Sequence, residues 1–299
     1  MLAGAEEELQ GSLTRMSALQ TLLAGFFDYA GLYPPASLGL AAAAKNYLNY
    51  ARGEHAWALG RFIVNADRLG ELRSIVSAAD LRRLKLSAIV SNAADTKEIF
   101  NELEQGSPVD TVEIKWSKPN VSGGVIEVPE SLKTYLEIQC GSNDGDTLDL
   151  ISGLGVRAKI RMGGVVPEAF PDAPSVVEVL CMLARRRVPF KATAGLHHPT
   201  RSSQPLTYEP QSLRATMHGF LNLCGAAAVV YFGGEDGIAE EILQDEDRVA
   251  WQIDEGSLRW RNLRWTTEHI AILRRDFFIS VGSCSFEEPM RDLEALGWL

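Results

Sequence analysis

The segment PFKATAGLHHPTR, at residues 189–201, combines residue types that could do chemistry at the end of a strand. Lys191 lies within a predicted strand, Gly195 makes a turn, and His197 and His198 follow it. A lysine and two imidazoles are poorly suited to a core, because burying polar groups costs free energy unless they are paired. An amine can attack a carbonyl carbon, and an imidazole can move protons near neutral pH. The segment therefore predicts part of an active site.

The predicted strands before this segment carry charged residues in the same phase. Side chains alternate between the two faces of a strand, and in six consecutive strands one face is apolar while the other is polar. Parallel strands covered by helices are usually apolar on both faces, so a polar inner face indicates a barrel with a binding site at its mouth. The polar set comprises Arg61, Ile63, Asn65, Ser87, Ile89, Ser91, Glu113, Lys115, Glu137, Gln139, Lys159, Arg161, Lys191 and Thr193.

These strands alternate with helices, which is typical of parallel strands joined by helical crossovers. Eight strands close a (β/α)8 barrel, so we expect an α/β fold of the TIM-barrel type. An irregular barrel or an open doubly wound sheet is the alternative if the first short segment is not a strand. The predicted strands are 26–29, 59–66, 85–91, 111–116, 134–140, 156–162, 190–194 and 277–282.

One domain is expected over residues 17–299, after a flexible N-terminus at 1–16. A helical and hairpin insertion is expected at about 203–265, with a long helix over 211–231 and a hairpin turn at Glu255 and Gly256. No repeat or low-complexity linker interrupts the alternation of strands and helices, which favours a single domain.

Charge on the polar face favours an anionic ligand. Two anions, Glu113 and Glu137, stand against five cations in a chain whose net charge is −10. This local imbalance predicts a small ligand with a phosphate or carboxylate group, although buried salt bridges without a chemical role are the alternative. The acidic chain as a whole argues against nucleic-acid binding. The five cations are Arg61, Lys115, Lys159, Arg161 and Lys191.

Loops at the strand ends supply further candidates for ligand binding. Barrels often bind phosphate after their last strands, and the glycine and serines of GSCSFEEP suit that role, with a helix cap as the alternative. His218 and Asn222, four residues apart, would share one face of the predicted helix. The candidates in loops and at strand ends are Asp28, Tyr29, Thr193, Gly195, Gly282, Ser283 and Ser285.

The four cysteines are scattered, with no C-x-x-C pair, which excludes a zinc framework or a disulfide-rich scaffold. No apolar run reaches the length of a membrane span, and no signal-peptide pattern opens the chain. We therefore expect a cytoplasmic protein with no membrane partner. No cofactor is predicted; a divalent metal held by Glu113, Glu137 and His197 is the alternative.

Four motifs resemble those of a family of uncharacterised bacterial proteins. They are DYAGLYPPA at 28–36, KATAGLHHP at 191–199, HGFLN at 218–222 and GSCSFEEP at 282–289. The resemblance spans nearly the whole chain and implies one site built from these loops, without naming a reaction. The stretch from Lys191 to Gly195 is also similar to the lysine strand of class I aldolase barrels, which implies a Schiff-base lysine.

Together these features predict an enzyme that acts on a small anionic carbonyl compound, with or without a phosphate group, by lyase, aldolase or isomerase chemistry. Lys191 would be a Schiff-base nucleophile whose pKa is lowered by the neighbouring cations. His197 or His198 would move protons and Glu137 would be a general base. Arg61 and Arg161 would hold the anion. The alternatives are a metal-dependent barrel enzyme and a non-catalytic protein that binds a small molecule or another subunit, including a homo-oligomer.

Overall fold

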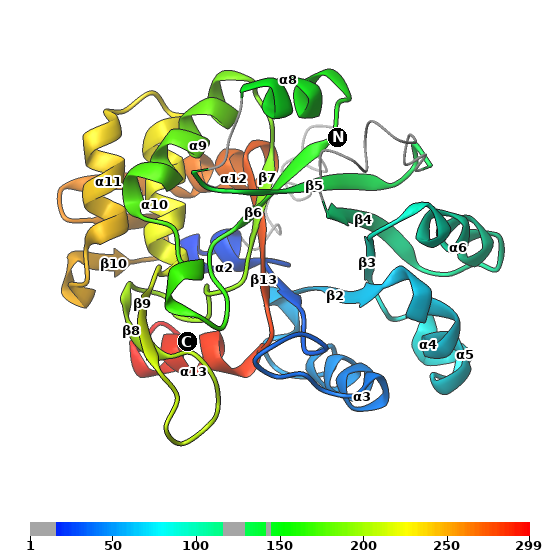
Figure 1. Ribbon diagram of the computed structural model, residues 1–299. Coiled ribbons are helices and arrows are strands. Elements are labelled where there is room, and N and C mark those ends of the chain that lie inside the picture. The colour runs from blue at the N-terminus through cyan, green and yellow to red at the C-terminus, as the bar shows by residue number, and fades with distance from the viewer. Residues whose placement is uncertain (1–15, 116–128, 142–144) are drawn as a thin grey trace, which may run out of the picture.

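Eight parallel strands form a closed barrel, as the alternation of strands and helices predicts (Figure 1). The structure is a computed structural model that describes residues 16–115, 129–141 and 145–299. Neighbouring strands follow the order β1-β13-β7-β6-β5-β4-β3-β2. Their bounds are β1 Phe27–Tyr29, β2 Leu59–Asn65, β3 Leu86–Val90, β4 Val109–Lys115, β5 Lys133–Gln139, β6 Arg157–Arg161, β7 Phe190–Thr193 and β13 Phe278–Ser283.

The short first strand settles whether the barrel closes. Phe27 pairs with Val281 of β13 on one side and with Leu59 of β2 on the other. The predicted strand at 26–29 is therefore confirmed, and the open-sheet alternative is wrong. The predicted flexible N-terminus lies outside the described residues except for Met16.

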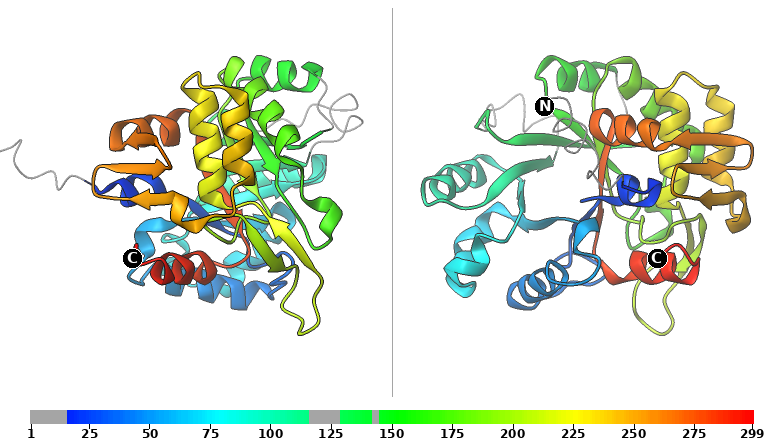
Figure 2. Two further views of the ribbon diagram at one scale, coloured as in Figure 1. Left: turned by 90° about the vertical axis from the view of Figure 1, so that its left-hand side faces the viewer. Right: turned by 180° about the vertical axis from the view of Figure 1, so that it is seen from behind.

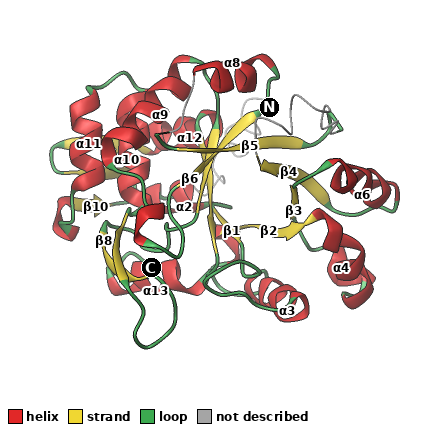
Figure 3. Ribbon diagram, in the orientation of Figure 1, coloured by secondary structure: helices red, strands yellow, loops and turns green. Residues whose placement is uncertain are grey.

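Helices surround the barrel (Figure 3) and cover the apolar face of its strands. Phe62, Val64, Ala88, Ile160 and Ala192 point outward from the barrel and are fully buried. Burying an aliphatic or aromatic side chain of this kind contributes about 1.5–3 kcal/mol. The helices of the described residues are α2 Ala18–Leu23, α3 Leu40–Tyr50, α4 Leu69–Ile75, α5 Ala78–Leu81, α6 Ala93–Glu104, α8 Gly145–Gly153, α9 Ala173–Arg185, α10 Phe220–Tyr231, α11 Asp236–Gln244, α12 Thr267–Asp276 and α13 Glu287–Ala295.

The connection from β7 to β13 contains further strands and helices. It opens with an antiparallel hairpin of β8 (Ser202–Pro205) and β9 (Arg214–Met217), which lies on the same side of the barrel mouth as α13 (Figures 1 and 2). A three-stranded sheet follows α11, and the predicted turn at Glu255 and Gly256 joins its first two strands. That sheet consists of β10 Trp251–Ile253, β11 Ser257–Trp260 and β12 Leu263–Thr266.

The predicted helix over 211–231 is wrong in its first half, because Arg214–Met217 pairs with β8 instead. Gly219 then caps α10 at a close crossing of the chain: a Cβ there would lie 2.4 Å from the carbonyl oxygen of Pro199. Only the apolar part of the predicted segment is helical. Across the described residues, the structure contains no helix that is long and apolar enough to cross a membrane.

Gly195 shows how closely the loops at the mouth pack. Its φ is +68°, and a Cβ there would lie 2.6 Å from the Phe170 ring and 3.2 Å from the Cα of Gly163. Gly233 has a similar φ of +79°, but nothing lies within 4 Å of its added Cβ. Comparing alanine substitutions at Gly195 and Gly233 therefore separates the cost of backbone strain from the cost of steric crowding.

We expect Gly233→Ala to lower the free energy of unfolding by about 1–2 kcal/mol, the cost of a left-handed non-glycine residue. Gly195→Ala should cost about 1–3 kcal/mol more, because the methyl group also displaces its neighbours. Urea unfolding of both variants at pH 7 measures the difference. Equal losses would contradict the close packing at Gly195.

Candidate active site

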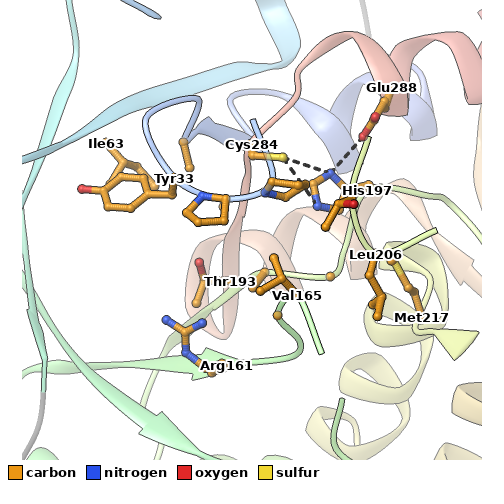
Figure 4. Close-up of a pocket in the computed structure, with 18 of the residues that line it drawn as sticks. Tyr33, Ile63, Arg161, Val165, Thr193, His197, Leu206, Met217, Cys284 and Glu288 are labelled. Atoms are coloured by element: carbon orange, nitrogen blue, oxygen red, sulfur yellow. Dashed lines mark hydrogen bonds and ion pairs between the residues drawn. The ribbon is translucent and has the colours of Figure 1, made fainter. Parts of the chain in front are cut away.

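A cavity of about 450 Å³ opens at the carboxyl ends of the barrel strands, and Figure 4 shows part of its lining. Its floor comes from the strand ends, and its walls come from the β1, β6, β7 and β13 loops and from the β8–β9 hairpin. The fold thus brings nine of the predicted site residues into one lining: Lys115, Glu137, Lys159, Arg161, Thr193, Gly195, His197, His198 and Gly282.

Lys191 lies beneath this floor, at the centre of a buried ion-pair network. Its Nζ is 2.5 Å from Oδ2 of Asp28 and 2.6 Å from Oε1 of Glu113, and all three side chains are 1% exposed. Ser280 donates to the same oxygen of Asp28, and Ser87 donates to Oε1 of Glu113. The lysine and the two carboxylates thus compensate one another in a site that water does not reach.

Lys159 connects this buried network to the floor of the cavity. Its Nζ is 2.7 Å from Oε2 of Glu113 and 2.8 Å from Oε2 of Glu137. Arg161, at the end of β6, donates through Nε to Oε1 of Glu137 at 2.9 Å. Charges therefore alternate from Lys191 through Glu113, Lys159 and Glu137 to Arg161, whose side chain is 37% exposed. Only the upper part of this chain of charges lines the cavity.

The predicted lowering of the Lys191 pKa is wrong. Burial lowers the pKa of Lys191, but the charges of Asp28 and Glu113 outweigh burial and raise it above its usual value. Burial likewise raises the pKa of Glu113, and the attraction of Lys159 and Lys191 outweighs it and lowers the pKa. Neighbouring carboxylates, rather than neighbouring cations, dominate the surroundings of Lys191. It is thus a charged structural centre at neutral pH.

The predicted excess of cations is largely balanced, and Arg61 does not reach the mouth. Arg61 forms a bidentate pair with Asp110 at 2.5 and 2.7 Å, and it does not line the cavity. Asp28 and Asp110 are anions that the alternation of the six strands did not assign to this face. Near the mouth, Lys115, Lys159 and Arg161 line the cavity with Glu137. Cations thus outnumber carboxylates among the side chains that line the floor, although Lys159 is also paired with Glu113 beneath it.

His197 forms one wall of the cavity together with Cys284 and Glu288. Its Nδ1 lies 3.1 Å from Oε2 of Glu288 and 3.1 Å from Oγ of Ser283, and both ring nitrogens lie 3.9 Å from Sγ of Cys284 (Figure 4). Burial lowers the pKa of His197, but Cys284 and Glu288 together outweigh burial and raise it to about 10. The ring is therefore an imidazolium at neutral pH.

His198 lines the same cavity but has a different partner. Its Nδ1 lies 2.6 Å from Oδ2 of Asp292 on α13. The two adjacent rings tilt by 52° with centroids 6.4 Å apart. Each histidine is thus held by its own carboxylate from successive turns of α13, and they do not act on a common atom.

Six other predicted residues do not line the cavity. The buried His218 and Asn222 contact Arg201 and hold loops together; His218 precedes α10, so the two are not on one helix face. Ser283 and Ser285 bond within their own loop and to the start of α13, which is the helix-cap alternative. The acids Glu287 and Glu288 in the first turn of α13 also disfavour an anion there. The six are Asp28, Tyr29, His218, Asn222, Ser283 and Ser285.

The alternative metal set does not come together. Glu113 and Glu137 are both held by Lys159, whereas His197 faces Cys284 and Glu288. Within 16–115, 129–141 and 145–299, no three histidine, cysteine or acidic side chains form a group that could hold a metal ion.

Sequence reasoning missed Cys284, Glu288 and Tyr33, all of which line the cavity. Cys284 and Glu288 are four residues apart in GSCSFEEP, where the loop after the last strand enters a helix, and that position was the available signal. Tyr33 donates to Oδ1 of Asn65 at 2.7 Å and closes the opposite wall. A tyrosine in a Gly/Pro-rich loop carries no such signal.

No family model matches the chain, and no curated protein matches it. The resemblance to a bacterial family thus stays a prediction. The barrel that the aldolase likeness implies is present.

We expect Lys191→Met to lower the free energy of unfolding at pH 7 by about 3–5 kcal/mol, because it leaves Asp28 and Glu113 without a buried partner. The loss should be smaller at pH 5, where the stranded carboxyl groups can take up protons. Lys45→Met, at an exposed lysine, is the matched control and should change stability by less than about 0.5 kcal/mol. Urea unfolding checks this; similar losses in the two variants would contradict the role of Lys191.

The raised pKa of His197 predicts a loss of stability at high pH. Its folded-state pKa of about 10 exceeds the usual 6.5, so the stabilisation is complete below about pH 6.5 and is lost as the pH rises toward 10. Between these pH values the wild type should lose on the order of 2–4 kcal/mol more unfolding free energy than His197→Gln. Glu288→Gln should show an intermediate loss. Parallel stability curves of wild type and His197→Gln would rule out the raised pKa.

Proposed function

We propose that this protein is an enzyme that acts on a small anionic carbonyl compound by lyase, aldolase or isomerase chemistry at the mouth of the barrel. The observation that carries the proposal is the pairing, in one cavity, of a cationic floor at Lys159 and Arg161 with an imidazolium wall at His197. A cavity of about 450 Å³ fits a small metabolite.

Arg161 is the group best placed to hold the anion. Among the described residues, its Nε and one terminal nitrogen both contact a single oxygen of Glu137, each at 2.9 Å. A guanidinium has five N–H donors in a planar fork, so others are available to a carboxylate or phosphate. Lys115, at the exposed end of β4, lines the same floor. A carboxylate and a phosphate group would both be recognised here.

The chemistry follows from the two ends of the cavity. Aldol cleavage and carbonyl isomerisation both pass through an enolate, so each needs a base for one proton and positive charge near the carbonyl oxygen. The His197 imidazolium supplies the charge, and it can also donate a proton. Glu137 is ionised, since Lys159 and Arg161 outweigh burial and lower its pKa. An anion that draws Arg161 away would raise the pKa of Glu137 and make it a stronger base.

Lys191 supports this site without taking part in it. Its amine is ion-paired on two sides and lies outside the lining, whereas a Schiff-base nucleophile must be neutral and reachable. The proposed enolate therefore forms without a lysine adduct, and borohydride should trap none on Lys191.

Anion binding is tested first. Sulfate, phosphate or a small dicarboxylate at ten times its Kd should raise the melting temperature by about 2–4 °C. Arg161→Gln should abolish the shift for the anions that bind. Arg186→Gln is the matched control, since Arg186 also donates through Nε to a carboxylate, that of Asp149, away from the cavity. Equal shifts in both variants would contradict the assignment of Arg161.

Turnover is tested by hydrogen exchange, which aldolases and isomerases share. Sugar phosphates and oxo-carboxylic acids that stabilise the protein are incubated with it in D2O, and loss of the C–H signal next to the carbonyl is followed by proton NMR. His197→Gln should slow exchange by about 100-fold or more, while the exposed α12 variant His269→Gln should not. Binding without exchange for every compound would overturn the enzyme proposal in favour of a small-molecule-binding protein.

A further inference from the structure

Cys284 is the cysteine that the barrel presents to the cavity. All four cysteines are free, and Cys140, Cys181 and Cys224 do not belong to the lining. Cys284 follows the last residue of β13 and is 6% exposed, so its small open surface faces the cavity. The enolate chemistry proposed above gives this thiol no part.

Two hydrogen-bonding groups from separate elements flank the sulfur. His197 lies 3.9 Å away through either ring nitrogen, and Oη of Tyr208, on the β8–β9 hairpin, lies 3.6 Å away. Burial raises the pKa of Tyr208, and Cys284 and Glu288 raise it further, so the phenol keeps its proton at neutral pH. An imidazolium and a phenol can both donate to a thiolate, which stabilises the charged sulfur.

Glu288 sets the orientation of the ring. It holds Nδ1 of His197 at 3.1 Å, which leaves Nε2 to exchange a proton with the sulfur or with a bound molecule. A nucleophile beside an imidazole that a carboxylate orients is the arrangement that activates a nucleophile for covalent catalysis. Figure 4 shows the three side chains in sequence along one wall.

We propose that Cys284 is a nucleophile that adds to the carbonyl carbon of a compound held in this cavity, with His197 as its proton donor and Glu288 as a positioning residue. The thiolate sulfur forms the new C–S bond, and the π electron pair of the carbonyl moves to its oxygen. That oxygen takes the proton of His197, which gives a neutral thiohemiacetal and a neutral imidazole. Reversal of these steps releases the carbonyl compound.

The placement of the charged groups limits the substrate class. Arg161 and Glu288 lie at opposite ends of the view in Figure 4, with Cys284 nearer to Glu288. A compound with a carboxylate or phosphate at one end and an aldehyde or ketone at the other would therefore meet Arg161 and Cys284 together. This substrate class rests on the proposed anion site; the nucleophilic character of Cys284 rests only on its own contacts.

Alkylation with iodoacetamide tests the thiol without any substrate. Peptide mass mapping at pH 7 should show Cys284 modified at least about tenfold faster than half-buried Cys140, whose pKa burial and the charge of Asp172 raise to about 12. Equal rates at the two cysteines would overturn the proposal.

Substitutions around Cys284 distinguish activation of the thiol by its neighbours from simple access of iodoacetamide to it. His197→Gln should slow the modification of Cys284 about tenfold or more at pH 7, and Glu288→Gln should slow it less. His269→Gln is the control, since His269 is an exposed histidine on α12 outside the lining, and it should leave the rate within about twofold. If His197→Gln does not fold, Tyr208→Phe and Glu288→Gln decide. Unchanged rates in the folded variants would overturn the proposal.

The outcome is independent of the proposed lyase or isomerase reaction. Rapid, His197-dependent alkylation without hydrogen exchange would overturn only the enolate chemistry. If the Cys284→Ser variant still catalyses hydrogen exchange and Cys284 of the wild type is alkylated slowly, only the proposal that Cys284 is a nucleophile is overturned.

Discussion

The ion pairs of Lys191 are the interaction on which the rest of the barrel depends. A lysine that is 1% exposed is tolerated only because Asp28 and Glu113 both lie within 2.6 Å of its Nζ. Asp28 is on β1, Glu113 is on β4 and the lysine is on β7, so one ammonium group ties three strands across the barrel interior. Removing any one member leaves an uncompensated buried charge, which costs more than the pair contributes. The stability of the barrel therefore depends on keeping these buried polar residues paired.

Because Asp28 and Glu113 neutralise Lys191, the charged groups that a ligand could reach lie closer to the cavity. Glu113 is shared between Lys191 and Lys159, and Lys159 passes the pairing on to Glu137. The alternation ends at Arg161, where the side chain is partly open to solvent. The proposed anion would be the next negative charge in this series, and the buried network holds Lys159, Glu137 and Arg161 in place at the cavity.

The wall opposite this floor has a different origin. His197 follows β7, Cys284 follows β13, Tyr208 belongs to the β8–β9 hairpin, and Glu288 is in the first turn of α13. These four residues meet because parallel strands all end at the same rim, and because the hairpin lies next to α13 (Figure 1). The floor of the cavity is thus made by strands, and this wall is made by loops, a hairpin and a helix end.

The sequence alone determined the closed α/β barrel, the inward phase of its polar residues and most of the cavity floor, because side-chain alternation and strand–helix order are local properties. Only the tertiary structure decided which charges are paired. Asp28 and Lys191 are 163 residues apart, so no local pattern shows that a carboxylate rather than a cation governs the lysine. Cys284 and His197 are likewise 87 residues apart. Interactions between distant segments set the pKa of a buried group, and they exist only once the barrel has closed.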